Sequence, residues 1–257
     1  MSDLNISFDA DAVLYEQYRP SYPQKLFLDI FSYSDLKLAA EILEIGIGTG
    51  QATEPFLDAG CKVSALEPGK NLSAFAREKF KKHSNFTLFE SSFEEFLAPE
   101  NFFDLVFTAT SFHWIPENIA CAKTKTLLRP GGAVALFWNR PFVAKTDDPL
   151  HRKIQSIYAK LRPLWRKPEE IETQKHAARK NMLTANGFSD ILFKLYHRQR
   201  FFSADNYIAL LNTYSDHRSM DNVSKISLER AIHQAILEFD KHLTIYDTID
   251  LYLGRKK

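Results

Sequence analysis

Three glycines at alternate positions are the first residues in this sequence whose type and spacing could do chemistry. Gly46, Gly48 and Gly50 come directly after the apolar run Glu41–Ile45. Glycine has no Cβ, so it adopts positive φ readily and lets the backbone lie against a ligand. The pattern predicts a buried strand that ends in a ligand-contacting turn, although glycines at alternate positions also occur in plain turns.

Two carboxylates near this turn could also take part in ligand binding. Glu44 lies inside the apolar run, where a carboxylate is costly to bury unless a polar or cationic group meets it. Glu67 follows a second apolar run and stands about twenty residues beyond the first glycine, the spacing at which Rossmann-type folds hydrogen-bond a ribose diol. Glu67 can accept from both hydroxyls, and a solvated carboxylate at the end of a strand is the simpler alternative.

At this point the chain resembles the class I, Rossmann-like methyltransferases that use S-adenosylmethionine. Their first motif is an acid followed by glycines at alternate positions, which here is Glu44 followed by Gly46, Gly48 and Gly50. In a dinucleotide-binding fingerprint the third glycine stands one position later, where this chain has Gln51. The spacing favours the methyltransferase, and an NAD(P)-dependent oxidoreductase or a nucleoside-binding protein without catalysis are the alternatives.

An aromatic segment before the first strand extends the resemblance. Residues 15–23 have the sequence YEQYRPSYP, in which two prolines prevent a continuing helix. Small-molecule methyltransferases similar to trans-aconitate methyltransferase carry such a segment, and it looks like the piece that closes over the cofactor. The resemblance implies that Arg19 pairs with the methionyl carboxylate and that Tyr15 or Tyr18 faces the sulfonium. An arm that only covers the edges of the core is the plainer alternative.

The adenine end of the site is implied less completely. Relatives carry Gly-Asp-Ala-Glu-Asp-Leu where this chain has residues 91–96, and the acid of that motif bonds the adenine amino group. Ser92 replaces the acid here, so the resemblance implies that the Ser92 hydroxyl makes the side-chain contact to adenine. The backbone N–H of Phe93 would make a second contact to adenine. The cofactor-binding residues that the resemblance implies are Tyr15, Tyr18, Arg19, Glu44, Gly46, Gly48, Gly50, Glu67, Pro68, Ser92, Phe93 and Thr108.

Three residues are candidates for a catalytic role. In open α/β sheets ligands bind outside the carboxyl ends of the strands, and His113 and Arg140 follow the fourth and fifth apolar runs there. His113 is a candidate general base, or else part of the pocket wall, and Arg140 is a candidate contact to an anionic acceptor. Tyr18 would stabilise the sulfonium. No catalytic triad is needed, because in-line positioning supplies most of the advantage in methyl transfer.

Composition limits the partners. The chain of 257 residues has 33 Lys plus Arg and 32 Asp plus Glu, and this net charge of +1 gives no global reason to expect nucleic acid or an anionic membrane. We expect a small-molecule substrate and a monomer or homodimer. The segment Met1–Asp11 has no basic or apolar stretch of a secretory signal, and Cys61 and Cys121 have no metal-like spacing. These features predict a cytoplasmic protein without a metal site.

The rhythm of apolar runs predicts an α/β fold. Strand and helix patterns alternate up to residue 141, which predicts a doubly wound, mostly parallel sheet. The resemblance implies seven strands, the last of them antiparallel, together with a helical lid. We expect an N-terminal arm (1–34), a Rossmann-like cofactor-binding core (35–141), the lid (142–187, with helices over 148–161 and 172–185) and a C-terminal part of the core sheet (188–257).

Overall fold

The computed structural model describes residues 12–162, 173–239 and 241–257. The chain divides into two compact units. We call one the sheet unit, which consists of Pro20–Asn139, Thr173–Tyr196 and Ile249–Lys257. We call the other the helical unit, which consists of the described residues of Met1–Arg19, Arg140–Glu172 and His197–Thr248.

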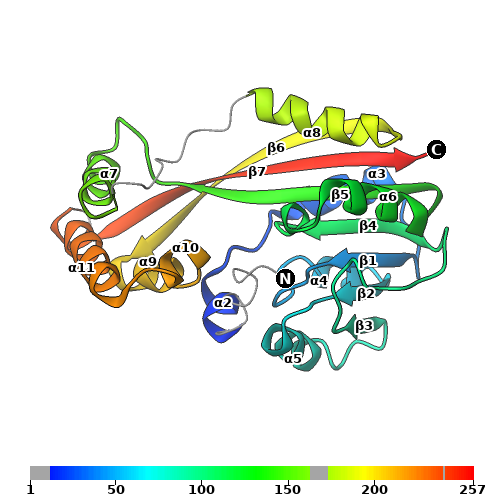
Figure 1. The fold of residues 1–257 in the computed structure, drawn as a ribbon, viewed down its shortest axis with the longest axis horizontal. Coiled ribbons are helices and arrows are strands. Elements are labelled where there is room, and N and C mark those ends of the chain that lie inside the picture. The colour runs from blue at the N-terminus through cyan, green and yellow to red at the C-terminus, as the bar shows by residue number, and fades with distance from the viewer. Residues whose placement is uncertain (1–11, 163–172, 240) are drawn as a thin grey trace. The chain divides into compact units, whose positions relative to one another are not determined.

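One seven-stranded sheet carries the fold, in the order β3-β2-β1-β4-β5-β7-β6 (Figure 1). The pairs β1–β2, β1–β4, β2–β3 and β4–β5 are parallel, and β7 runs antiparallel between β5 and β6. The predicted fold class is therefore confirmed. The strands are β1 (Glu41–Ile45), β2 (Lys62–Leu66), β3 (Phe86–Phe89), β4 (Phe103–Ala109), β5 (Leu128–Phe142), β6 (Phe188–Ser203) and β7 (His242–Lys256).

The central strands are apolar on both faces because helices cover both. Neighbouring residues of one strand belong to different core clusters, as Ile42 and Leu43 of β1 do. Phe107 of β4 joins Ile42 in the first cluster, and Val106 joins Leu43 in the second. The period of two in the side-chain direction produces this division.

The helices of the sheet unit supply the outer layers. Helices α3, α4 and α5 contribute Leu26, Phe56 and Ala76 to the first cluster, and α6 and α8 contribute Cys121 and Leu183 to the second. The helices are α3 (Gln24–Ser34), α4 (Glu54–Asp58), α5 (Lys70–Lys79), α6 (Glu117–Leu127) and α8 (Thr173–Ala185), together with the short 3₁₀ helix η1 (Phe112–Trp114).

Two local details differ from the sequence expectation. The sequence predicts a short helix over 51–59, ended by Gly60, but the helix begins only at Glu54, because Pro55 must lie in the first turn of a helix, where its missing N–H is not needed. The Arg-Pro-Gly-Gly sequence at 129–132 predicts a turn; in the structure these residues are part of β5, whose pairing with β4 is interrupted there. Phe103 of β4 pairs with Leu128 and Leu105 with Ala133, so the Arg-Pro-Gly-Gly residues between form a bulge, in which Arg129, Pro130 and Gly131 are exposed and Gly132 is buried.

The helical unit has its own hydrophobic core. Helices α7 and α11 meet through Ile154, Leu228 and Ile232, and Leu243 and Ile245 of β7 join the same cluster. Polar N-caps start three of its helices, for example Asp148, whose carboxylate accepts from the His151 N–H at 3.0 Å. The helices are α2 (Ala12–Tyr18), α7 (Pro149–Leu161), α9 (Ala204–Leu211), α10 (Ser215–Arg218) and α11 (Asn222–Glu238).

Of the two helices expected in a lid, α7 belongs to the helical unit and α8 to the sheet unit, and a lid role for the segment 142–187 stays a prediction. The predicted start of the second lid helix at Glu172 and the segment Met1–Asp11 lie outside the described residues. No helix among the described residues is both long and apolar enough to cross a membrane. Within the same residues, no group of three or more His, Cys, Asp or Glu side chains could hold a metal ion.

Candidate functional site

The glycine loop lies at the point where the strand order of the sheet reverses. β1 pairs with β2 on one side and with β4 on the other, so the loops after β1 and β4 leave the sheet in opposite directions. Open α/β sheets bind their ligands at such a switch point, outside the carboxyl ends of the strands. The loop that follows β1 therefore lies where open α/β sheets usually bind their ligands.

All three glycines of the loop have positive φ, as predicted. The φ angles are +71° at Gly46, +59° at Gly48 and +83° at Gly50, a region that other residues adopt only at a cost. The loop is fixed at its start, because the N–H groups of Gly46 and Ile47 donate to the Leu66 carbonyl at 2.9 and 3.0 Å. Backbone hydrogen bonds thus join the end of β1 to the end of β2.

Gly50 is the position at which a larger residue should do the most damage. A Cβ there would lie against the Phe80 ring, 2.7 Å from Cζ, in addition to the cost of positive φ. We expect Gly50→Ala to lower the free energy of unfolding by roughly 2 to 4 kcal/mol. Gly131 is the matched control, because its φ is +78° and nothing lies within 4 Å of an added Cβ. Urea unfolding that gives equal losses for the two variants would contradict the tight contact.

A serine that the sequence did not single out closes the other side of the loop. Ser111 follows β4, and its hydroxyl donates to the Ile45 carbonyl at 2.5 Å and is hydrogen-bonded to the Thr108 hydroxyl. A Cβ on Gly46 would lie 2.8 Å from the Ser111 Cβ. The loops after β1 and β4 are therefore in direct contact, and Gly46 permits that approach. Thr108 lies buried beside this contact.

The Glu67 carboxylate joins the two turns that follow β1 and β2. It accepts from the Gly48 N–H at 2.9 Å and from the Gly69 N–H at 3.0 Å, and only 7% of the residue is exposed. The turn that contains Pro68 is held further by Ser73, whose hydroxyl donates to the Glu67 carbonyl at 2.9 Å. Each carboxylate oxygen can accept two hydrogen bonds, so Glu67 can hold the loop and bind a ligand hydroxyl together.

Glu44 is buried near the carboxyl end of β1 and is hydrogen-bonded to a neutral partner. The Thr53 hydroxyl donates to its Oε2 at 2.7 Å, and the residue is 1% exposed. Burial raises the pKa of Glu44 to about 8; the Thr53 bond and the charge of Lys79 oppose the rise, and Glu67 adds to it. We expected a polar or cationic group beside the buried Glu44 carboxylate, and the Thr53 hydroxyl is that polar group. Because its pKa is raised to about 8, Glu44 is mostly protonated and neutral at pH 7.

The two residues expected at the adenine end lie after β3. The Ser92 hydroxyl accepts from the Glu95 N–H at 3.3 Å, and the Phe93 side chain is buried in the second core cluster. The serine thus starts a local turn. A contact from either residue to adenine stays a prediction.

Hydrogen bonding defines the tautomer of His113, the candidate base. The Trp138 indole N–H can only donate, and it lies 3.3 Å from Nδ1 of His113. A neutral His113 that accepts this bond carries its proton on Nε2, so it presents a donor there rather than a base. The Arg179 guanidinium covers the Trp138 ring at 3.6 Å, which makes this edge of the sheet unit cationic.

Tyr22, from the predicted aromatic segment, belongs to this same edge. Its hydroxyl is hydrogen-bonded to that of Thr110 at 2.9 Å, and its ring meets Phe137 edge-on at 4.8 Å. Thr110 also accepts from the Asn139 N–H at 3.3 Å, at the end of β5 in the sheet unit. The sequence left open whether this segment closes over a cofactor or covers the edges of the core, and Tyr22 packs on the first core cluster.

Residues 15–19 of the aromatic segment belong to the helical unit. Arg19 donates to the Thr213 carbonyl at 2.8 Å and lies over the rings of Tyr15 and Tyr214, at 4.7 and 4.6 Å from their centroids. Tyr18 packs against the core of the helical unit. Arg140 is a partly buried residue of β5 and is assigned to this unit too. Roles for Tyr15, Tyr18 and Arg19 in cofactor binding stay predictions.

Comparison with known proteins places this geometry in context. Residues 42–132 match a family model described as a methyltransferase domain, and this segment contains the glycine loop, Glu67 and Ser111. An uncharacterized methyltransferase of Mycobacterium bovis is 28% identical over 137 residues, which are 53% of this chain and 54% of the relative. The chain thus spans about half the length of that relative. An uncharacterized methyltransferase of Bacillus thuringiensis is 29% identical over 63% of this chain and 75% of its own length.

Solved structures show the same fold. A protein assigned as a type II methyltransferase of Anaeromyxobacter dehalogenans superposes with a TM-score of 0.64 and 20% identity, over 93% of this chain and 98% of its own. Phosphoethanolamine N-methyltransferase 2 of Haemonchus contortus, solved with phosphomonomethylethanolamine and S-adenosylhomocysteine, gives a TM-score of 0.57 at 14% identity, over 100% of this chain and 60% of its own. The seven-stranded sheet of this chain thus has the fold of these solved methyltransferases.

Proposed function

We propose that this chain transfers the methyl group of S-adenosylmethionine to a small-molecule acceptor that carries a carboxylate. One observation carries the first part of the proposal. The positive-φ glycine loop lies at the switch point of a methyltransferase-type sheet and is tied by the Glu67 carboxylate to the end of β2. This arrangement combines close backbone approach with a carboxylate placed for a ribose diol.

The residues present fit this cofactor. Gly48 has no Cβ and a positive φ, so its backbone beside the Glu67 carboxylate could lie against the ribose of the ligand. Glu67 would accept from the ribose hydroxyls. Ser92 and Phe93 would contact adenine, the serine through its hydroxyl and the phenylalanine through its backbone N–H. Glu44 would hold the loop from beneath through Thr53, whose hydroxyl it binds at 2.7 Å.

S-adenosylmethionine supplies an activated methyl group and a neutral leaving group, so the protein mainly has to position the acceptor in line with it. The segment after β4 would form one wall of the site, with Phe112 buried and Trp114 exposed. His113 would donate from Nε2 to the acceptor rather than remove a proton from it. A carboxylate acceptor suits this site, because it is deprotonated near neutral pH and needs no base.

The size and charge of the acceptor rest on fewer observations. The net charge of +1 offers no general attraction to nucleic acid, and the resemblance of residues 15–23 to small-molecule methyltransferases favours a metabolite. Arg140 would bind the acceptor carboxylate, since a guanidinium meets a carboxylate with two parallel hydrogen bonds.

A screen for methyl transfer tests this proposal. We expect labelled methyl from S-adenosylmethionine to appear on a carboxylate-bearing member of a metabolite library, and Arg140→Ala to raise KM for that acceptor about tenfold or more. Arg230→Ala, an exposed arginine of α11, is the control and should keep the wild-type KM. A wild-type KM in Arg140→Ala would refute the arginine contact. Methylation of tRNA or protein with no metabolite product would refute the acceptor class.

A further inference from the structure

Thr110, the residue that follows β4, has a backbone conformation that threonine rarely adopts. Its φ is +61°, in the left-handed region that a β-branched side chain disfavours. Among the described residues it is the one β-branched residue with a positive φ. The other non-glycine residues with positive φ are Asp35, Ala39, Asn101, Asp190 and Lys241. Such conformations persist where the surrounding structure holds them, and they gather at functional sites. Thr110 begins the loop after β4, at the switch point of the sheet.

Three hydrogen bonds hold Thr110 in this conformation. Its N–H donates to the Phe137 carbonyl at 2.8 Å, and its hydroxyl accepts from the Asn139 N–H at 3.3 Å. The pairing of β4 with β5 ends at Ala109 and Phe137, so the hydroxyl supplies an acceptor to β5 where the backbone of β4 has turned away. The third bond joins the Thr110 hydroxyl to the Tyr22 hydroxyl at 2.9 Å. A glycine would adopt this φ at lower cost but would lose both hydroxyl bonds.

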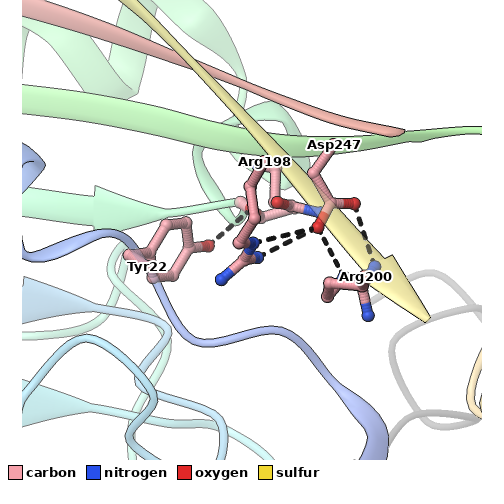
Figure 2. A network of polar contacts seen from close by, with 6 residues as sticks. Tyr22, Arg198, Arg200 and Asp247 are labelled. Carbon is pink, nitrogen blue, oxygen red and sulfur yellow. Dashed lines mark hydrogen bonds and ion pairs between the residues drawn. The ribbon is translucent and has the colours of Figure 1, made fainter. Parts of the chain in front are cut away.

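Tyr22 holds the same turn with both parts of its side chain. Figure 2 shows its hydroxyl at one end of a hydrogen bond, whose other end is Thr110. Its ring meets the Phe137 ring edge-on at 4.8 Å, and the carbonyl of Phe137 accepts from the Thr110 N–H. The ion pairs also drawn in Figure 2 belong to the helical unit and join Asp247 to Arg198 and Arg200. Tyr22 is thus placed to resist a change in the backbone at Thr110.

The turn at Thr110 sets the position of Ser111, which contacts the glycine loop. The Ser111 hydroxyl donates to the carbonyl of Ile45, the residue directly before Gly46, at 2.5 Å. A Cβ on Gly46 would lie 2.8 Å from the Ser111 Cβ, so the two residues approach as closely as a glycine permits. Because this contact leaves no free space, a displacement of Ser111 must also shift the start of the glycine loop.

We propose that Tyr22 and Thr110 are positioning residues for cofactor binding. The bond between their hydroxyls holds the left-handed turn, the turn holds Ser111 against Gly46, and the glycine loop is thereby kept in the form that binds S-adenosylmethionine. Neither residue has to touch the ligand for this role. The ligand is that of the proposed function, on which this inference rests.

Calorimetric titration of the full chain with S-adenosylmethionine tests this role. Tyr22→Phe keeps the ring and removes only the hydroxyl, and Thr110→Val keeps the β-branched shape and removes the other hydroxyl. Each variant should bind about three- to tenfold more weakly, the range that one hydrogen bond supplies. The double variant should bind no more weakly than Thr110→Val alone, because both changes remove the same bond. Thr110→Ser keeps the hydroxyl and should bind like the wild type.

Tyr33→Phe is the matched control. Tyr33 belongs to α3 of the same unit, and its hydroxyl donates to the carbonyl of Asp190, near the start of β6, at 2.8 Å. This variant also loses one tyrosine hydrogen bond, so urea unfolding should show a loss of stability similar to that of Tyr22→Phe. Its affinity for S-adenosylmethionine should nevertheless be that of the wild type.

The outcomes separate a positioning role from a structural one. If Tyr22→Phe and Thr110→Val bind S-adenosylmethionine as the wild type does, or if Tyr33→Phe weakens binding equally, the hydroxyl pair is only structural and the proposal is wrong. It is also wrong if Thr110→Ser binds as weakly as Thr110→Val, because the hydroxyl is then not the group that acts. A wild-type chain that does not bind S-adenosylmethionine overturns the proposed function itself, and this inference with it.

Discussion

Replacing Glu67 with alanine is expected to weaken S-adenosylmethionine binding by roughly tenfold or more. The carboxylate would form charge-assisted hydrogen bonds with the ribose diol, worth about 1.5 to 3 kcal/mol. It also holds the glycine loop, because it accepts from the Gly48 N–H at 2.9 Å. Both losses act in the same direction, so the effect should be the largest of any single side chain in the site. Isothermal titration of the purified variant measures it.

Two further variants separate ligand contact from loop support. Glu67→Gln keeps one acceptor for the Gly48 N–H but loses the charge, so its affinity should fall between the wild type and Glu67→Ala. Glu90→Ala removes an exposed acid just after β3 and should bind normally. If Glu67→Ala binds S-adenosylmethionine with the wild-type affinity, the assignment of Glu67 to the ribose is wrong.

The second large effect concerns stability and pH. The pKa of Glu44 is raised from 4.5 to about 8, so between these values the folded chain keeps a proton that the unfolded chain has released. Stability therefore falls as pH rises through this window. One pKa unit corresponds to about 1.4 kcal/mol, so the total linked loss is on the order of 5 kcal/mol at most. Glu44→Gln carries no titrating group and should escape this loss.

Urea unfolding at pH 5 and pH 8 measures the difference. We expect the stability of Glu44→Gln relative to the wild type to increase by roughly 2 to 5 kcal/mol between the two pH values, without ligand. The glutamine oxygen can still accept from Thr53, which Glu44 binds at 2.7 Å. Glu41→Gln, at the partly exposed first residue of β1, should keep the wild-type pH dependence. Identical pH dependence in wild type and Glu44→Gln would show that Glu44 is ionised in the folded chain.

Short-range patterns in the sequence predicted much of the sheet unit. Glycine tolerates positive φ wherever it stands, so the turn at Gly46, Gly48 and Gly50 followed from residue type alone. The position of Glu67 at the end of β2 followed from its distance to that turn. The last strand is predicted by the alternation of apolar residues at Leu243, Ile245, Ile249, Leu251 and Leu253, because a period of two is a local property.

Features that depend on register could not be predicted in the same way. Ser111 reaches the Ile45 carbonyl across 66 positions, and a single serine after a strand carries no signal of that contact. Asp247 visibly interrupts an apolar face of β7, but its partners Arg198 and Arg200 follow only from the pairing of β6 with β7. The raised pKa of Glu44 also needs the packed sheet, because the apolar residues that desolvate it come from distant parts of the chain.

Titration of the wild-type chain with S-adenosylmethionine, S-adenosylhomocysteine and NAD tests the central claim most directly, since all three ligands carry an adenosine ribose for Glu67. The glycine loop has Gln51 where a dinucleotide site has its third glycine. We predict saturable binding of S-adenosylmethionine and S-adenosylhomocysteine at one site per chain, with no measurable heat from NAD. Binding of NAD in preference to both sulfur-containing ligands would contradict the account.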